Sequence, residues 1–269
     1  MKKLLLVCIL PIVLLFGCTK DKKVNFFTVQ QDIKLGEQLD AEIQSNATEY
    51  PLLDRTKNPA VYSYLEAMRD DILSSNLIFH RSDFTWKVTV INKNVLNAFA
   101  APGGKIYIYT GLLKNVKSSA ELAGILAHEI THADRRHSTQ QMTKNNMVNI
   151  ALSVILGQDS TALKNMAKQM ASGAAALAWS REYEYEADSM AVDFVYSIRN
   201  RKNYKCDALT DFFKRMDASS TATYTPEWLQ THPLDSKRIA RVNGHFVKLG
   251  SPAGDLFTSE YSSFVAKLP

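Results

Sequence analysis

Cysteine is scarce in this sequence, which also lacks a long apolar run and an arginine-rich run. The 269 residues contain three cysteines, too few for a small domain held together by disulfides. The amino-terminal apolar run, Leu4 to Phe16, is shorter than the roughly 20 residues that span a bilayer as a helix. The net charge of +5 is mild and no arginine-rich run supports it, so we expect no nucleic-acid partner. The 46% of apolar residues are enough for one sizeable core.

The first residues instead predict a targeting segment. Lys2 and Lys3 precede the apolar run, and the letters LFGC, which end at Cys18, follow at once. This arrangement resembles the lipobox of bacterial lipoproteins, in which the cysteine is acylated and becomes the first mature residue. We therefore expect residues 1–17 to be a signal peptide and Cys18 to carry a lipid. An ordinary secretory signal with a chance cysteine is the alternative.

The chain after the signal peptide is predicted to consist of a short tether and one domain. Residues 18–30 are polar and lysine-rich and should tether the lipid to a single domain at 31–269, which includes a carboxy-terminal helix. Thr19 is unlike the aspartate that retains lipoproteins at the inner membrane. We therefore expect a location in the cell envelope, at the periplasmic face of the outer membrane. Oligomeric state is left open.

Periodicity predicts a mainly helical α+β domain with a small sheet. Residues 84–91 alternate and are β-branched, and a Pro-Gly-Gly turn precedes a second strand at 105–109. For residues 151–177 core packing is the default, and a surface that touches membrane or closes over a cleft is the alternative. Apolar residues at helical spacing predict helices at 32–43, 59–73, 179–198, 207–216, 233–242 and 256–268.

One further helix, residues 118–137, organises the domain. Ser118 and Glu121 form a capping box at its start, and the helix should run on toward residue 150. His128 and His132 are four residues apart, so both imidazoles can reach one ion from the same face. Glu129 directly follows the first histidine, as zinc peptidases require of the group that activates water. A lone match to this pentapeptide also occurs by chance, so a third ligand is the test.

The extended form of the motif does not supply that ligand. It would need glycine at position 135 and histidine at 138, whereas the chain has Arg135 and Ser138. His137 is nine residues from His128, about 180° around a continuous helix, and should point away from the ion. We interpret His137 as structural or bound to another group.

A better candidate lies in the run SREYEYEAD. Glu184 and Asp188 share one helical face with alanines that would allow close approach to the first helix, whereas Glu182 and Glu186 fall on the opposite side. We predict Glu184 as the third metal ligand and Asp188 as the group that orients a ligand imidazole. A solvated acidic face is the alternative, and the alanines argue against it.

Four segments in order, NAFAAPGGKIYIYTGLL, HEITH, SREYEYEAD and THPLDSKRI, resemble the gluzincin family of CAAX prenyl endopeptidases and Oma-type proteases. The lipobox points to its soluble bacterial lipoprotein branch, the BepA- and LoiP-like proteases. The resemblance implies a zincin-like fold with the sheet beside the active-site helix. BepA-like proteins also carry a carboxy-terminal tetratricopeptide array, and only 27 residues follow Val242, so no role of that array is carried over.

The resemblance also implies further site residues. Asn97 and Ala98 would lie on an edge strand that pairs with extended substrate, although Asn97 could simply shape a turn. His232 would donate to the oxyanion or act as a fourth ligand that blocks the metal in a resting state. Arg238 matches the family's arginine and is grouped with Glu129 and His232 as catalytic.

These features predict a zinc endopeptidase of the bacterial cell envelope, with one Zn2+ per chain. Its expected partners are unfolded or misassembled envelope proteins, and the membrane through the lipid on Cys18. The alternative is a metal-binding, chaperone-like lipoprotein whose zinc site is latent or structural. A small-molecule hydrolase is weaker, because an edge strand suits extended peptide.

Overall fold

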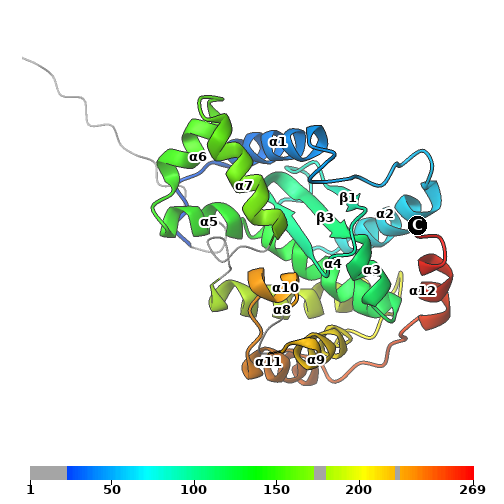
Figure 1. Ribbon diagram of the computed structural model, residues 1–269. Helices are drawn as coiled ribbons and strands as arrows, with labels where there is room; N and C mark the ends of the chain where they lie inside the picture. The colour runs from blue at the N-terminus through cyan, green and yellow to red at the C-terminus, as the bar shows by residue number, and fades with distance from the viewer. Residues whose placement is uncertain (1–22, 173–179, 222–224) are drawn as a thin grey trace, which may run out of the picture.

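The computed structural model describes residues 23–172, 180–221 and 225–269 (Figure 1). Helices predominate, and one small sheet lies among them. The elements are α1 Val29–Ser45, α2 Pro59–Leu73, β1 Lys87–Ile91, β2 Ala98–Ala101, the 3-10 turn η1 Pro102–Gly104, β3 Lys105–Tyr109, α3 Thr110–Asn115, α4 Ser119–Asp134, α5 His137–Lys144, α6 Val148–Ile155, α7 Ser160–Ser172, α8 Arg181–Ser197, α9 Leu209–Ser219, α10 Glu227–Thr231, α11 Ser236–Lys248 and α12 Thr258–Val265.

The sheet has the strand order β1-β3-β2, with β1 parallel and β2 antiparallel to β3. The turn between β2 and β3 needs glycine, because Gly103 and Gly104 have φ angles of 71° and 84°. Successive side chains of a strand face opposite sides of a sheet, and here both sides are buried. Ile106 and Ile108 join one hydrophobic core, and Tyr107 and Tyr109 join the other.

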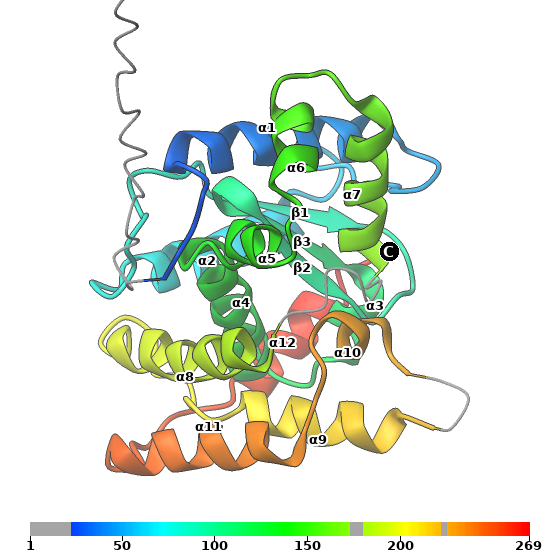
Figure 2. The ribbon, with the colours of Figure 1, turned by 90° about the vertical axis from the view of Figure 1, so that its left-hand side faces the viewer.

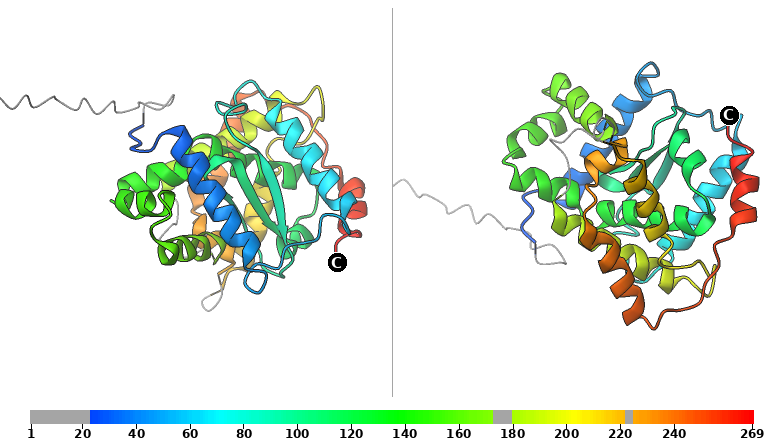
Figure 3. Two further views of the ribbon diagram at one scale, coloured as in Figure 1. Left: turned by 90° about the horizontal axis from the view of Figure 1, so that it is seen from above. Right: turned by 60° about the horizontal axis from the view of Figure 1, so that its bottom comes forward.

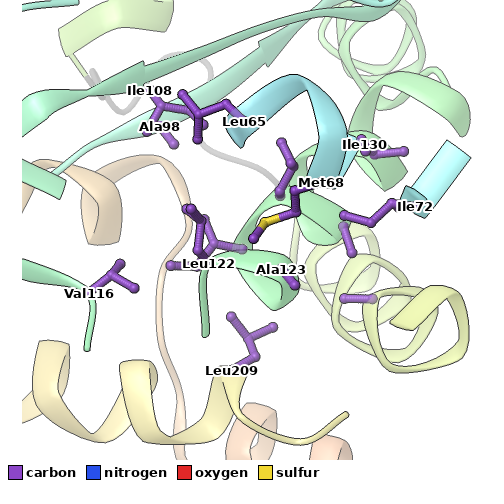
Figure 4. Packing of buried hydrophobic residues seen from close by; sticks show 14 of the residues in the cluster. Leu65, Met68, Ile72, Ala98, Ile108, Val116, Leu122, Ala123, Ile130 and Leu209 are labelled. Atoms are coloured by element: carbon purple, nitrogen blue, oxygen red, sulfur yellow. The ribbon is translucent and has the colours of Figure 1, made fainter. Parts of the chain in front are cut away.

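The first core lies between the sheet, α2 and α4 (Figure 4). Leu65 and Met68 of α2 meet Leu122 and Ile130 of α4 there. The strands contribute alternate residues to this core, and α2 and α4 contribute apolar residues at helical spacing. Burial of the apolar face of α4 therefore places this helix against the sheet.

The second core covers the other face of the sheet with α1, α6 and α7, and the views from the side and from above show α1 lying across the strands (Figures 2 and 3). Gly36 lets α1 rest directly on η1, because a Cβ there would lie 2.0 Å from the carbonyl oxygen of Pro102. Met166 and Met170 of α7 are buried, so the described part of residues 151–177 confirms core packing.

Helix α4 is enclosed on all sides, and each of its residues from Ser119 to Asp134 is buried. Helices α8, α9 and α11 lie on the side away from the sheet (Figure 3, right). Half of the predicted capping box forms: the Ser118 hydroxyl accepts from the Glu121 amide. The Glu121 carboxylate instead accepts from the Lys117 amide and pairs with Arg215.

The structure differs from the predicted bounds at several places, including the start of α1 at Val29 and the end of α11 at Lys248. The helix predicted to run from 118 toward 150 breaks after Asp134, because Arg136 adopts the left-handed conformation with φ 59° and ψ 33°. The first strand begins at Lys87, three residues later than predicted. The packed region begins earlier than residue 31, because Asn25 and Phe27 are already buried.

The predicted signal peptide and lipid anchor are not tested by the structure. Residues 1–17 and Cys18 lie outside the described residues, so the signal peptide and lipidation stay predictions. Within the described ranges, the structure contains no helix that is both long and apolar enough to cross a membrane.

Candidate metal centre

Helices α4 and α8 form the two walls of the site. Ala187 and Ala191 of α8 are buried and leave room for a close approach of the two helices, as the sequence predicts. His128 and His132 project from α4, and Glu184 projects from α8. His232 follows the last residue of α10 and completes a cluster in which one ligand atom of each residue lies within 4.8 Å of the others.

The donor atoms converge on one point. The Nε2 atoms of His128 and His132 are 3.0 Å apart, and Glu184 Oε1 lies 3.3 Å from His132 Nε2. The ligand atoms of a tetrahedral zinc ion lie about 3.3 Å apart, given Zn–N bonds of about 2.0–2.1 Å. All of these side chains are buried. Nitrogen and carboxylate donors at this spacing fit a zinc ion.

The protonation states also suit metal binding. Burial lowers the pKa of His132 well below its ordinary value, so the imidazole is neutral and can offer a lone pair. Burial opposes ionisation of Glu184, but Arg238, His232 and His132 outweigh burial and hold the pKa of Glu184 well below its ordinary value. The site therefore presents the neutral imidazole of His132 and the carboxylate of Glu184.

Arg238 of α11 supports the acidic side of the site. Its Nη1 lies 2.7 Å from Glu184 Oε2, and its other two nitrogens donate to the two carboxylate oxygens of Asp188 at 2.7 and 2.8 Å. Asp188 Oδ1 in turn lies 3.1 Å from His128 Nδ1. Asp188 thus stands where a group that orients a ligand imidazole must stand. Arg238 also lies over the rings of Phe213 and Trp228, and its predicted catalytic role stays a prediction.

Glu129 is fully buried beside the cluster. Its Oε1 faces the indole nitrogen of Trp228 and His232 Nε2, both at 3.4 Å, and its Oε2 is buried without a hydrogen-bond partner. Burial raises the pKa of Glu129 to about 8. A carboxyl group with one unpartnered buried oxygen next to the ligands is placed to take a proton from a bound water.

The raised pKa of Glu129 predicts a pH effect in the chain freed of metal. The folded state keeps this proton up to about pH 8, whereas the unfolded state releases it above the ordinary value of 4.5. The contribution of Glu129 to stability is therefore present below 4.5 and is lost as the pH rises toward 8. In urea unfolding with chelator at pH 5 and pH 8, Glu129→Gln should lose less stability than the wild type. Exposed Glu182, changed to glutamine, should keep the wild-type slope.

His232 occupies the position of a fourth ligand in this conformation. Its Nδ1 is 3.0 Å from Glu184 Oε1 and 3.2 Å from His128 Nε2. Its ring stacks on Trp228 with centroids 4.6 Å apart, and its carbonyl accepts from Arg238 Nη1 at 3.0 Å. Of the two roles that the resemblance implies for His232, the described conformation has the arrangement of the fourth ligand.

His137 is not among the clustered ligand atoms. The reason differs from the predicted one, because the helix ends before His137 and the ring returns toward His132. The two Nδ1 atoms lie 3.0 Å apart. His137 therefore contacts a candidate ligand from behind, and Glu186, predicted on the far side of α8, lies 3.4 Å beyond it.

Asn97 and Ala98 lie at the edge of the sheet, because β2 pairs only with β3 among the described strands. Figure 2 shows β2 on the side of the sheet toward α4 and α10. The Asn97 amide donates to the carbonyl of Ala171 in α7 at 3.0 Å, and every residue of β2 is buried. The edge position is confirmed, and pairing with substrate stays a prediction.

Sequence reasoning missed Trp228. Its indole contacts Glu129 and His232 and lies 5.7 Å from the His128 ring. The available signal was its spacing, four residues before His232, which places the two rings on one side of a helical turn.

The fold and the site together define a class. An α+β domain with a small sheet beside a buried HEITH helix, and a glutamate from a second helix that clusters with its two histidines, is a zincin-like metallopeptidase domain of the gluzincin type.

The comparisons with known proteins identify the family. The model of "Peptidase family M48" matches residues 60–245, well over half of the chain. The chain belongs to peptidase family M48.

Individual relatives are similar over part of their length. The "Mitochondrial metalloendopeptidase OMA1" of Arabidopsis thaliana is 31% identical over 159 residues, which cover 59% of this chain and 31% of the relative. The "Beta-barrel assembly-enhancing protease" of Yersinia pestis is 26% identical over 200 residues, 69% of this chain and 40% of the relative. The protein of the same name from Escherichia coli O157:H7 is 25% identical over 226 residues, which cover 79% of this chain and 43% of the relative. The chain thus spans less than half the length of these three relatives.

Proposed function

We propose that this chain is a zinc-dependent endopeptidase that cleaves unfolded or misassembled proteins of the bacterial cell envelope. The observation that carries the proposal is the convergence of His128, His132 and Glu184 with Glu129 buried beside them, in a chain of peptidase family M48. One Zn2+ per chain would be held by the two histidines and Glu184. When bound, the ion supplies a Lewis acid that polarises the scissile carbonyl and activates water.

The chain's own residues supply the proton transfers and the positioning. Glu129 takes a proton from the attacking water and later delivers it to the leaving amine, first as general base and then as general acid. Asp188 keeps the proton of His128 on Nδ1, 3.1 Å away, and leaves Nε2 free for the ion.

His232 must move for catalysis. In the described conformation its Nδ1 stands among the ligand atoms, where it would close a four-ligand shell. Substrate needs that position, so we propose that this conformation is a resting state. An imidazole that leaves this position would be free to donate a hydrogen bond to the oxyanion, a contribution typically worth about 3 kcal/mol.

Substrate would bind along the edge strand. Asn97 and Ala98 mark the start of the side of β2 that pairs with no other strand among the described residues. Pairing with an extended chain would use main-chain hydrogen bonds, which carry little sequence preference. The relatives named as beta-barrel assembly-enhancing proteases support an envelope role. The lipid on Cys18 would hold the enzyme at the periplasmic face of the outer membrane.

The experiment that tests the proposal measures metal and proteolysis together. The chain from residue 19 onward should contain about one zinc per molecule and cleave an unfolded protein such as casein, and a chelator should abolish cleavage. A chain that binds zinc yet shows no cleavage under any condition contradicts the proposal.

A second function is favoured by one specific observation, the position of His232. A closed site of four protein ligands is typical of structural zinc, so the chain could instead hold unfolded envelope proteins without cutting them. The two functions separate in one assay. Suppression of client aggregation that survives chelation, without any cleavage, identifies the holding protein.

The role of Glu184 gives a prediction of its own. Glu184→Ala removes the only carboxylate of the clustered ligands, so zinc affinity should fall by more than the 10–100-fold loss typical when only a supporting partner of a ligand is lost. Zinc titration against a competing chelator measures the change. Glu182→Ala, an exposed position on the same helix, should bind zinc as the wild type does. Equal affinity of the Glu184 and Glu182 variants would exclude Glu184 as a ligand.

A further inference from the structure

The buried imidazole of His137 stands behind one of the candidate ligands and has no part in the proposed mechanism. The chain leaves α4 after Asp134, turns at Arg136 in the left-handed conformation, and begins α5 at His137. This turn brings His137 Nδ1 to 3.0 Å from His132 Nδ1, on the side of His132 away from the cluster. The two rings meet edge to face, with an interplanar angle of 77°.

The other edge of His137 faces a carboxylate. His137 Nε2 lies 3.4 Å from Glu186 Oε2, and the same carboxylate pairs with Lys23. The His137 ring is stacked on Tyr183 with centroids 4.5 Å apart, which fixes the plane of the imidazole. A row of polar groups thus runs outward from His132 through His137 and Glu186 to Lys23.

Only one placement of protons is consistent with metal binding along this row. His132 offers Nε2 to the cluster, so the single proton of its neutral ring must be on Nδ1. That Nδ1–H points at His137 Nδ1, which must therefore accept. His137 then carries its own proton on Nε2, where Glu186 can accept it.

We propose that His137 is a positioning residue that fixes the tautomer and the ring orientation of His132, and that Glu186 holds His137 in the accepting state. The inference rests on the proposed zinc-binding function. The two ligand histidines would then be supported differently, since a carboxylate faces Nδ1 of His128 and an imidazole faces Nδ1 of His132. Partners of this kind orient ligand imidazoles and raise their basicity.

The amino-terminal segment contributes to the same support. Asn25 donates to Thr139 Oγ1 in α5 at 2.9 Å, and Arg136 donates to the carbonyl of Phe27 at 2.5 Å. These contacts hold the segment that carries Lys23 against the turn that carries His137. The row of polar groups therefore ends at Lys23, in a segment that is packed against α5, and this packing keeps Lys23 beside Glu186.

The first test uses zinc affinity of the full chain, measured by competition with a chelator. His137→Phe keeps a planar ring for stacking on Tyr183 but cannot accept from His132, and it should bind zinc about 10–100-fold more weakly. His137→Gln provides an amide oxygen that can accept and should recover part of the loss. His245→Phe is the matched control, because His245 pairs with Asp193 at 2.8 Å, outside the clustered ligands and the His137 row, and should leave affinity unchanged.

The second test reads the protons directly in the wild-type chain and so does not depend on the folding of a variant. In zinc-loaded protein labelled with 15N-histidine, NMR should place the proton of His132 on Nδ1 and that of His137 on Nε2. A proton on Nδ1 of His137 would overturn the inference. So would wild-type affinity in folded His137→Phe.

The outcomes also separate this inference from the proposed function. If the wild-type chain fails to bind zinc, the proposed function fails first. If the wild type binds zinc and cleaves casein while folded His137→Phe binds zinc equally well, only the role of His137 is wrong.

Discussion

Glu129→Gln should bind zinc as tightly as the wild type and cleave an unfolded protein about 10²–10⁴-fold more slowly, which is the typical contribution of a general acid–base group. Glutamine has nearly the shape of glutamate, and its amide can keep the contacts with Trp228 and His232. It cannot accept the proton of the attacking water. The change should therefore appear in kcat and leave the metal site intact.

The measurement is zinc content by metal analysis together with casein cleavage at saturating zinc. Glu182→Gln controls for the loss of one carboxylate, because Glu182 is exposed on α8 and should retain full activity. Cleavage at the wild-type rate by the Glu129 variant would show that another group takes the proton, and His232, 3.4 Å from Glu129, would be the next candidate.

Arg238→Met should lower the free energy of unfolding of the metal-free chain by about 3–5 kcal/mol, the usual loss when one partner of a buried ion pair is removed. Arg238 is 1% exposed and contacts Glu184 and Asp188 at once. Burial alone would lower the pKa of Arg238, but the two carboxylates outweigh it and raise that pKa, so the guanidinium stays charged. Methionine fills much of the space but leaves both acids without a cation.

Urea unfolding in the presence of chelator measures this loss. Arg241→Met is the matched control on the same helix: Arg241 is exposed and lies over the Tyr185 ring at 4.1 Å, so its loss should cost less than about 1 kcal/mol. Added zinc should restore part of the stability of Arg238→Met, because the ion supplies positive charge beside Glu184 and binds the folded state alone. Equal stability of the two variants would mean that the acids find another partner.

Much of the local structure follows from the sequence. Helix α2 occupies 59–73 and strand β3 occupies 105–109, as predicted, because each shows a clean apolar period and is bounded by turn residues. The prediction at the end of α4 is wrong. The periodicity after Asp134 remains helical, but a single residue, Arg136, turns the chain, and its guanidinium donates to Asp32 and to Phe27.

The site also divides into features that the sequence predicts and contacts that only the structure shows. The spacing of His128 and His132 and the shared face of Glu184 and Asp188 are properties of one helix each, so they are readable from the chain alone. The structure brings Glu184 and His232 into one cluster with both histidines. The contacts of His137, Trp228 and Arg238 join residues from different elements, and no local period reports such contacts.

The sequence by itself therefore predicted the faces of α4 and α8 that carry the candidate ligands and the bounds of β3, because these depend on side-chain spacing along single elements. Its four motifs, taken together, resembled the family to which the chain belongs. Only the tertiary structure decided which groups contact the candidate ligands from behind. The left-handed turn at Arg136 returns His137 to His132, and the packing of α11 on α8 buries Arg238 between two acids. In a buried site a charge or an N–H must find a partner, and long-range packing selects which one it finds.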